Sequence, residues 1–316
     1  MSVSAEDRRI RRLRPPKPPV DPRVAHGTIL EAERRPGGAT ERAVTVFLAG
    51  AECPFTCSFC DLWRWTLDGP TPPGALPQQL SRALEPLPRP YPERIKLYNA
   101  GNFFDRRAVP AGDVPAIAEL LAPFSGVTVE SHANTIGPLT LEFARLLPEG
   151  SRLEVAMGLE TIHPLAVSRL NKRLDQAGFE RAAGFLAAHH LDLRVFVLLG
   201  VPYVESGASV DWTVRTVHYA ARCGARTVTV IPVRGGNGEM ERLAALGHFV
   251  PPRLVELEAA LDRCLGLAPV VAVDLWDIDR LPACPRCGPR RIARLRRLNL
   301  TGRPEPPIDC LACAGS

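Results

Sequence analysis

Short apolar stretches alternate with amphipathic stretches along the chain from residue 43 to residue 236. The apolar stretches are rich in Val, Leu and Ile, and they lie at 43–50, 94–100, 126–134, 152–161, 192–202 and 227–236. Between them, apolar residues recur at helical spacing near 78–84, 114–121, 139–147, 165–170, 179–189 and 210–223. Six strand–helix units with nearly continuous apolar strands predict a parallel sheet covered on both faces. We therefore expect an α/β fold, a partial (β/α)6 barrel of the TIM-like type.

The segments on either side of this pattern differ in composition. Residues 1–40 combine the arginine run RRIRRLR with PPKPP and PGG, which predicts a mobile or surface-hugging basic arm to which no fold is assigned. A helix at 253–265 and a strand at 270–278 extend the predicted sheet. The expected organisation is an arm over 1–40, a core barrel over 41–280 and a cysteine-bearing tail over 281–316.

Composition and charge narrow the class of protein. The chain has 316 residues, of which 46% are hydrophobic and 23% charged, and no apolar run approaches the length of a membrane span. Its start lacks the apolar core of a signal peptide, so we expect a cytoplasmic protein with no membrane partner. The net charge of +5 reflects an arginine excess that a GC-rich coding sequence would also produce, and it does not by itself indicate nucleic-acid binding. Nine reduced cysteines then point to metal binding or catalysis.

Three of these cysteines follow the first predicted strand in the segment AECPFTCSFC. Cys53, Cys57 and Cys60 supply one thiolate fewer than a four-iron cluster takes, so a cube bound here would keep one iron open. In a parallel barrel this loop lies at the carboxyl ends of the strands, where chemistry gathers. A zinc site completed by a distant His, or unliganded thiols, are the alternatives.

The spacing CxxxCxxC after a first strand resembles the signature of the radical S-adenosylmethionine (SAM) superfamily, and the resemblance covers about residues 43–240. It implies a radical SAM barrel with a 4Fe–4S cluster whose open iron chelates SAM. In that family the reduced cluster splits SAM to a 5'-deoxyadenosyl radical, with an electron donor such as flavodoxin or ferredoxin. Phe59 matches the aromatic residue that the family places beside the adenine.

Further positions carry over one at a time. Gly101 matches the family's turn after the second strand, but the usual Gly-Gly-Glu is absent, so Asn102 or the backbone would hold the SAM amino group. A plain glycine turn is the alternative. Glu130 and His132 stand where a carboxylate often contacts SAM, or they are solvated loop residues. The remaining positions that the resemblance implies for SAM are Glu160, Thr161, Lys172 (or Arg169), Leu199, Gly200 and Val233.

Within the superfamily, AGNFFD, GLET and VPYVES look most like the branch with the Elongator catalytic subunit, with a methylthiotransferase-like core. Within this branch, the segments most resemble the radical-SAM subunit of archaeosine synthase. This resemblance implies modification of RNA, with C–N bond cleavage on a tRNA base. The alternatives are a metal-stabilised nucleic-acid-binding or scaffold protein on a degenerate barrel, and a radical SAM enzyme that acts on a small molecule.

The tail carries a second cysteine motif. Its four cysteines form CxxC-x22-CxxC, which predicts a tetrahedral zinc site or a second iron–sulfur cluster at Cys284, Cys287, Cys310 and Cys313. Seven arginines lie between Arg286 and Arg303, which predicts a metal-held module that contacts RNA phosphates. A solvated basic hairpin docked on the barrel is the alternative.

Overall fold

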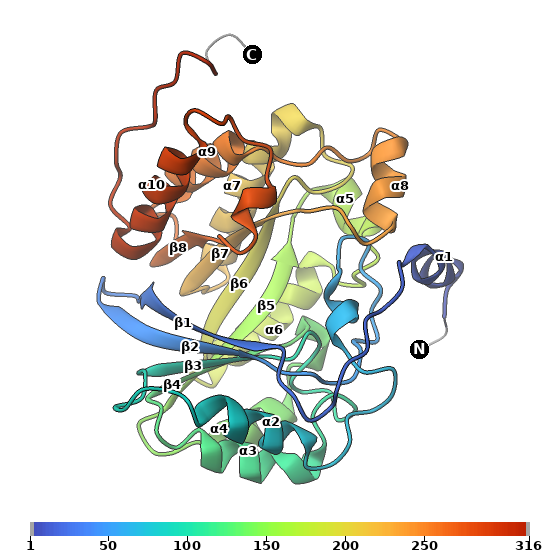
Figure 1. The fold of residues 1–316 in the computed structure, drawn as a ribbon, viewed down its shortest axis with the longest axis vertical. Helices are drawn as coiled ribbons and strands as arrows, with labels where there is room; N and C mark the ends of the chain where they lie inside the picture. The colour runs from blue at the N-terminus through green and yellow to red at the C-terminus, as the bar shows by residue number, and fades with distance from the viewer. Residues whose placement is uncertain (1–2, 314–316) are drawn as a thin grey trace.

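A computed structural model describes residues 3–313 of the chain (Figure 1). It contains one eight-stranded sheet whose strands follow the order of the chain. The first pair is antiparallel and every later pair is parallel. The strands are β1 (Gly27–Arg34), β2 (Thr40–Phe47), β3 (Arg94–Tyr98), β4 (Gly126–Glu130), β5 (Arg152–Glu160), β6 (Asp192–Leu199), β7 (Thr227–Pro232) and β8 (Val270–Val273). The curled sheet confirms the predicted partial barrel.

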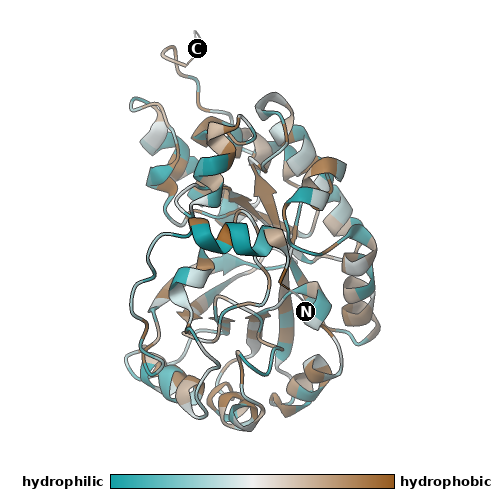
Figure 2. Ribbon diagram, turned by 90° about the vertical axis from the view of Figure 1, so that its right-hand side faces the viewer, coloured by the Kyte–Doolittle hydropathy of each residue, from teal (hydrophilic) through white to brown (hydrophobic). Residues whose placement is uncertain are grey.

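Most of the helices cover the outer face of this sheet, whereas α1 lies apart from that layer (Figure 1). The helices are α1 (Ala5–Leu13), α2 (Ala75–Leu84), α3 (Val114–Leu120), α4 (Pro138–Leu146), α5 (Pro164–Arg169), α6 (Gln176–Ala188), α7 (Ser206–Arg222), α8 (Glu239–Ala245), α9 (Leu254–Cys264) and α10 (Gly288–Thr301). Figure 1 shows α2, α3 and α4 beside the early strands and α7, α9 and α10 beside the late ones. Figure 2 shows brown, apolar residues interspersed with hydrophilic ones along the central strands. None of the helices within 3–313 is long and apolar enough to span a bilayer.

Alternate residues of each strand face outward into the core or inward into the barrel. Val46 and Leu97 are fully buried under the outer helices, whereas their inward-facing neighbour Lys96 is charged. The registers pair Thr45 with Lys96, and Lys96 with Thr128, so the inward positions form layers across the sheet. The period of two therefore separates an apolar outer core from a polar interior.

The lower interior of the barrel is filled by paired charges. Glu154 is fully buried, and its carboxylate accepts hydrogen bonds from Arg194 at 2.9 Å and from Arg35 at 3.1 Å. Arg194 also donates to Glu33 of β1 at 2.7 Å, and Lys96 pairs with Glu31 of the same strand. These cations lower the pKa of Glu33 to about 2 against the opposing effect of burial. Buried charges persist only when they are paired, and here they close the floor of the barrel.

Residues 1–40, predicted as a mobile or surface-hugging arm with no fold assigned, contain two regular elements. Ser4 caps α1, and β1 adds an eighth strand to the sheet through its full pairing with β2. The composition of residues 1–40 did not predict β1. In the sequence, Glu31 and Glu33 look like solvated charges, but in the structure they pair with cations on other strands. The barrel sheet therefore begins at Gly27, upstream of the expected boundary at residue 41.

The tail also differs from the predicted basic loop, since five of its seven arginines lie on the helix α10. This helix packs against α9, β1 and β8. The side chain of Asn299 hydrogen-bonds the edge strand twice, accepting from the Val273 N–H at 2.9 Å and donating to the Val273 carbonyl at 2.8 Å. The Asn299 amide thus takes the place of a neighbouring strand and pairs the free N–H and carbonyl of Val273 at the sheet edge. In this way α10 covers the gap between β8 and β1.

Candidate cluster and cofactor site

The CxxxCxxC loop leaves the carboxyl end of β2 and is tied to three other parts of the barrel. The Ala51 N–H donates to Thr71 Oγ1 at 2.8 Å, and the Ser58 N–H donates to the Leu170 carbonyl at 2.9 Å. From the opposite side, Asn237 donates to the Ser58 carbonyl at 2.8 Å. These bonds fix a segment without regular secondary structure at the edge where the strands end.

The three thiols of this loop are half-buried. Burial raises the pKa of Cys57 to about 12, although the nearby Lys172 ammonium pulls that pKa downward. The Asn102 side chain donates to Cys53 Sγ at 3.3 Å. Within residues 3–313, the three sulfurs do not gather around one ion-sized centre as the tail cysteines do. A cube needs wider spacing, because each thiolate binds a different iron.

The turn after β3 brings Asn102 against this loop. Ala100 adopts a φ of 52°, and a Cβ on Gly101 would lie 3.3 Å from the Ala51 carbonyl oxygen. Asn102 is 2% exposed, and its Oδ1 accepts the His132 N–H at 2.8 Å. Both ends of the Asn102 amide are therefore used within the protein. Its position indicates a role beside Cys53, and not the free carbonyl that the sequence suggested.

Glu130, at the end of β4, is the carboxyl group that faces the same turn. Burial raises its pKa to about 7, opposed by the backbone N–H groups of residues 99–101. Its Oε1 is buried and has no hydrogen-bond partner among the described residues. His132 follows on the chain, stacks on Phe55 at 4.0 Å, and has its pKa lowered to about 3 by burial. Glu130 is thus an available acid, and His132 is a neutral packing residue.

Glu160 and Lys172 form a buried ion pair at the end of β5. Lys172 Nζ donates to Glu160 Oε1 at 2.6 Å, and Glu160 adopts a φ of 67° beside an irregularity in the β5–β6 register. Burial opposes the charge of Lys172, but Glu160 and the nearby thiols raise its pKa. Thr161 is 2% exposed, and its hydroxyl accepts the N–H of His163, the N-cap of α5, at 3.1 Å, so Thr161 supports the start of that helix.

The residues expected beside adenine gather on the inward face of β6 and β7. Phe59 packs on a cluster that includes Leu198, Val201 and Val233. The side chain of Leu199 instead belongs to the outer core, because it is the neighbour of the inward-facing Leu198. Leu198 is therefore the leucine of this turn that borders the site. Gly200 has a φ of 78°, and a Cβ there would lie 2.6 Å from Pro252 Cδ, so the turn requires glycine.

The donor set suits a cluster and a polar cofactor. Three thiols lie on the loop after β2, and four buried polar atoms on this loop and at the ends of β3 and β4 lack partners within residues 3–313. These atoms are Ser58 Oγ, Asn99 Nδ2, Asn99 Oδ1 and Glu130 Oε1. Buried polar groups in native proteins are nearly always hydrogen-bonded, so a polar ligand would satisfy this group.

Below the mouth, aromatic side chains from distant strands meet inside the barrel. Phe47 lies 6.2 Å from Tyr98 and 5.7 Å from Trp276, and Tyr98 meets Phe196 edge-on at 6.2 Å, all between ring centroids. Phe47, Tyr98 and Phe196 are half-buried, and Trp276 is 57% exposed. Water therefore reaches this aromatic wall, which the sequence did not reveal because its members are far apart along the chain.

The four tail cysteines form a separate centre. Their sulfurs all lie within 4.8 Å of one another, and those of Cys287 and Cys313 are 3.7 Å apart. Backbone N–H groups of Arg286 and Cys287 lower the pKa of Cys284 to about 7. The predicted metal-binding cluster at the carboxyl end is therefore confirmed.

The arginines between these cysteines are divided between the interior and the surface. Arg291 donates to Cys287 Sγ at 3.2 Å and pairs with the buried Glu258, while Arg294 is 1% exposed and pairs with Asp262 at 2.7 Å. Arg297 pairs with Glu305. Arg291 and Arg294 attach α10 to α9, so neither is available for the phosphate contacts predicted for the tail. Arg286, Arg290, Arg296 and Arg303 remain exposed.

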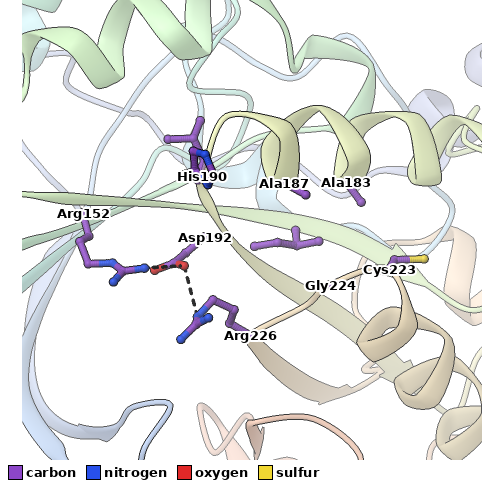
Figure 3. A pocket seen from close by; sticks show the side chains of 10 residues that line it. Arg152, Ala183, Ala187, His190, Asp192, Cys223, Gly224 and Arg226 are labelled. Carbon is purple, nitrogen blue, oxygen red and sulfur yellow. Dashed lines mark hydrogen bonds and ion pairs between the residues drawn. The ribbon is translucent and has the colours of Figure 1, made fainter.

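A surface hollow lies at the other end of the barrel (Figure 3). It is lined by Arg152, His190 and Arg226, among others, at the amino ends of β5, β6 and β7. Both arginines pair with Asp192, at 3.1 Å and 3.2 Å. The two arginines of the hollow are therefore already paired with a carboxylate. The hollow also lies at the amino ends of the strands, the end of a parallel barrel that contributes stability and not chemistry.

Three polar residues that follow β7 have partners within the protein. Asn237 holds the cluster loop, Glu239 pairs with Arg9 at 2.9 Å, and Arg234 pairs with Asp274 at 3.4 Å. The sequence missed Asp7, whose carboxylate accepts from Thr56 Oγ1 at 2.5 Å. The sequence signal was Ser4 followed three residues later by an acid, which is a capping box.

No protein-family model matches the sequence, and no curated protein is similar to it. Several solved structures are similar. The archaeal Methanocaldococcus infernus Elp3 with an N-terminal deletion has 14% identity and a TM-score of 0.51, over 70% of this chain and 59% of that one. A radical SAM methyltransferase from Sphaerobacter thermophilus has 17% identity and a TM-score of 0.50, over 78% and 73%. Methylornithine synthase has 12% identity and a TM-score of 0.52, over 82% and 69%.

The chain thus spans less than two thirds of the Elp3 chain that it matches. At such low identities the likeness is one of fold. The chain shares the barrel fold of these three proteins.

Proposed function

We propose that this chain is a radical SAM iron–sulfur enzyme that cleaves SAM at a cluster held by Cys53, Cys57 and Cys60. One observation carries the proposal: three half-buried thiols lie at the mouth of a barrel with this fold, beside buried polar atoms without partners. The spacing CxxxCxxC supports it independently. A scaffold role on a degenerate barrel would give no reason to keep these features together.

The chain's own residues bind and orient. Asn102 donates a hydrogen bond to Cys53 Sγ, and Lys172 places a positive charge near the thiolates. Glu130, Gly101 and the backbone of the same turn surround the place for the SAM amino group. Glu160 and Lys172 offer opposite charges to the polar end of SAM, and Phe59 with Val233 borders the adenine. Gly200 permits the tight turn beneath. When bound, cluster and SAM supply a 5'-deoxyadenosyl radical.

The substrate would lie against the aromatic wall of Phe47, Tyr98 and Phe196, below the mouth. A flat unsaturated ring suits such a surface, because stacking on aromatic side chains favours π-systems. RNA carries rings of this kind, and the exposed arginines of α10 add phosphate contacts. We therefore keep a tRNA base as the proposed substrate, with C–N bond cleavage of the archaeosine-synthase type. Flavodoxin or ferredoxin in the cytoplasm would supply the electron.

The tail cysteines are proposed to bind zinc. Tetrahedral coordination with Zn–S bonds of about 2.3 Å places neighbouring sulfurs about 3.8 Å apart. The 3.7 Å between Cys287 and Cys313 fits that geometry. A second iron–sulfur cluster would hold its thiolates further apart on separate irons.

Anaerobic reconstitution tests the catalytic proposal. The wild-type chain, reduced with dithionite and supplied with SAM, should release 5'-deoxyadenosine, and the triple Cys53/Cys57/Cys60→Ala variant should release none. Equal release by the two proteins, or none by a wild type that holds four irons, would overturn it.

Filter binding of tRNA across a salt series tests the substrate class separately. Affinity should fall as salt rises, by roughly 0.7 to 0.9 in logarithmic slope per phosphate contact. Arg290→Glu with Arg296→Glu should flatten that slope. A salt-independent affinity would move the proposal to a small-molecule substrate.

A further inference from the structure

The amino-terminal helix α1 lies across the side of the barrel where the strands end. In Figure 2, which looks at the molecule from that side, α1 is the largely hydrophilic helix in front of the strands. Two of its nine residues are buried, Asp7 at 4% exposure and Ile10 at 3%. A surface arm has no reason to bury a carboxylate, so the surroundings of Asp7 define what α1 does.

The Asp7 carboxylate receives hydrogen bonds from the cluster loop and from the segment 171–173. Thr56 Oγ1 donates to Oδ1 at 2.5 Å from the position before Cys57. Asn171 Nδ2 donates to Oδ1 at 3.0 Å, and Arg173 pairs with Oδ2. These bonds lower the pKa of Asp7 well below its usual range, against the opposing effect of burial. Asp7 is therefore held as a carboxylate and joins two segments far apart in sequence.

The segment that Asp7 reaches needs external support. Asn171 and Arg173 adopt φ values of 52° and 58°, which side chains other than glycine rarely take. Between them lies Lys172, the partner of Glu160. Asn171 also donates to the Thr56 carbonyl at 3.0 Å. Strained backbone persists where surrounding contacts fix it, and Asp7 supplies such contacts on both flanks of Lys172.

Further contacts hold α1 along its length. Arg9 pairs with the fully buried Glu239 carboxylate at 2.9 Å. Arg14, just after the helix, pairs with Glu52 at 2.7 Å and lies 4.7 Å over the Trp63 ring. At Gly238, a Cβ would lie 1.8 Å from the Leu13 carbonyl oxygen, so this position must be glycine for the helix to dock. The seat of α1 is thus built from several loops of the mouth.

We propose that α1 is a clamp that holds the cluster loop against residues 170–173, and that Asp7 is its positioning residue. The clamp slows loss of iron from the Cys53, Cys57 and Cys60 site and entry of oxygen. The part of this inference that concerns iron and oxygen rests on the proposed function of the cluster. The part that concerns the order of the loop does not depend on that function. In this proposal Asp7 does not contact the three cysteines. It acts on the cluster loop through Thr56 and Asn171.

The test compares Asp7→Ala with Glu6→Gln, its half-buried neighbour on α1, in the full chain. Hydrogen exchange in metal-free protein should show faster exchange over 53–60 and 170–173 for Asp7→Ala alone. After reconstitution, iron transfer to a chelator and bleaching in air should accelerate by roughly tenfold or more, because Asp7→Ala removes the carboxylate that accepts from Thr56 and Asn171 and joins their two segments. Glu6→Gln should change the rates of iron loss and bleaching by no more than about twofold, because substitutions away from buried contacts have small effects.

Thr56→Val serves as a second variant if Asp7→Ala does not fold, since it removes one donor and keeps a β-branched side chain. It should accelerate iron loss in the same direction. Exchange and iron-loss rates that match the wild type in either folded variant would overturn the clamp. A wild type that binds no cluster would overturn the proposed function, while the metal-free exchange comparison would still decide whether α1 orders the loop.

Discussion

Lys172 Nζ lies 2.6 Å from Glu160 Oε1, and this ion pair fills the space that a side chain at Gly158 would need. A Cβ at Gly158 would stand 1.9 Å from Glu160 Oε1 and 2.7 Å from Lys172 Nζ. The pair therefore depends on a glycine inside a strand, two residues before Glu160. Close approach of other groups is one of the few reasons for such a glycine.

Gly158→Ala should displace this pair and weaken SAM binding by about tenfold, the effect of 1.4 kcal/mol. Calorimetric titration of reconstituted protein with SAM measures it. Gly184→Ala is the matched control, because Gly184 is exposed on α6 with open space around its Cβ. That control should stabilise the fold by up to about 1 kcal/mol and leave SAM affinity unchanged. Equal SAM affinity for Gly158→Ala and the wild type would separate the pair from the cofactor.

Glu130 should make folding stability depend on pH. Burial raises its pKa from 4.5 to about 7, so the folded state holds the proton more tightly than the unfolded chain does. Stability is then lost as pH rises from about 4.5 to about 7. Glu130→Gln should remove this loss, and relative to the wild type it should gain up to about 3 kcal/mol between pH 5 and pH 8.

Urea unfolding at the two pH values measures that gain. Glu142→Gln, at an exposed carboxyl on α4, is the control and should show the same difference from wild type at both. A gain of the same size for both variants would argue against a buried, protonated Glu130.

The hydrogen bond from Asn102 to Cys53 should raise the reduction potential of the cluster. A donor to a cluster sulfur stabilises the more negative, reduced state. Asn102→Ala should therefore lower the potential by tens of millivolts, which corresponds to roughly 1 kcal/mol. A redox titration followed by electron paramagnetic resonance gives the value. Asn134→Ala, which removes an amide bonded to the Arg173 carbonyl, should leave it unchanged.

The two cysteine groups should bind different metals. The purified chain should hold iron at the CxxxCxxC loop and one zinc at the tail, because the tail sulfurs have single-ion spacing. Cys287→Ser should lose zinc and keep iron, and Cys57→Ala should do the reverse. Elemental analysis of both variants decides this, and iron in the tail of the Cys57→Ala protein would indicate a second cluster.

Asn299 should contribute measurably to stability at the barrel edge. Asn299→Leu removes both hydrogen bonds to Val273 and leaves a strand N–H and carbonyl unpaired under α10. The expected loss is about 1–3 kcal/mol in the free energy of unfolding. Arg296→Ala, at an exposed site on the same helix, should change it by about 0.5 kcal/mol or less. A similar small change for Asn299→Leu would mean that α10 does not close this edge.

The sequence alone determined strands β2 to β8 and the two cysteine motifs, because these are local patterns. Strand periodicity follows from burial of every second residue, and three thiols within eight residues lie together whatever surrounds them. The parallel order then fixed which loops meet at the mouth, since carboxyl ends of parallel strands share one edge. Cys53, Gly101, Glu130 and Glu160 could therefore be expected near one another.

Tertiary structure alone decided what each polar residue does. Arg291 and Arg294 lie on one helix with exposed arginines, and only the position of α9 makes them buried partners of Glu258 and Asp262. Asp7 belongs to an arginine-rich segment, yet it joins Thr56 to Asn171 across long stretches of chain. Pairing of buried charges depends on three-dimensional distance, which a one-dimensional pattern does not contain. A charged residue that looks solvated in the sequence can therefore be identified as a buried ion-pair partner only from the fold.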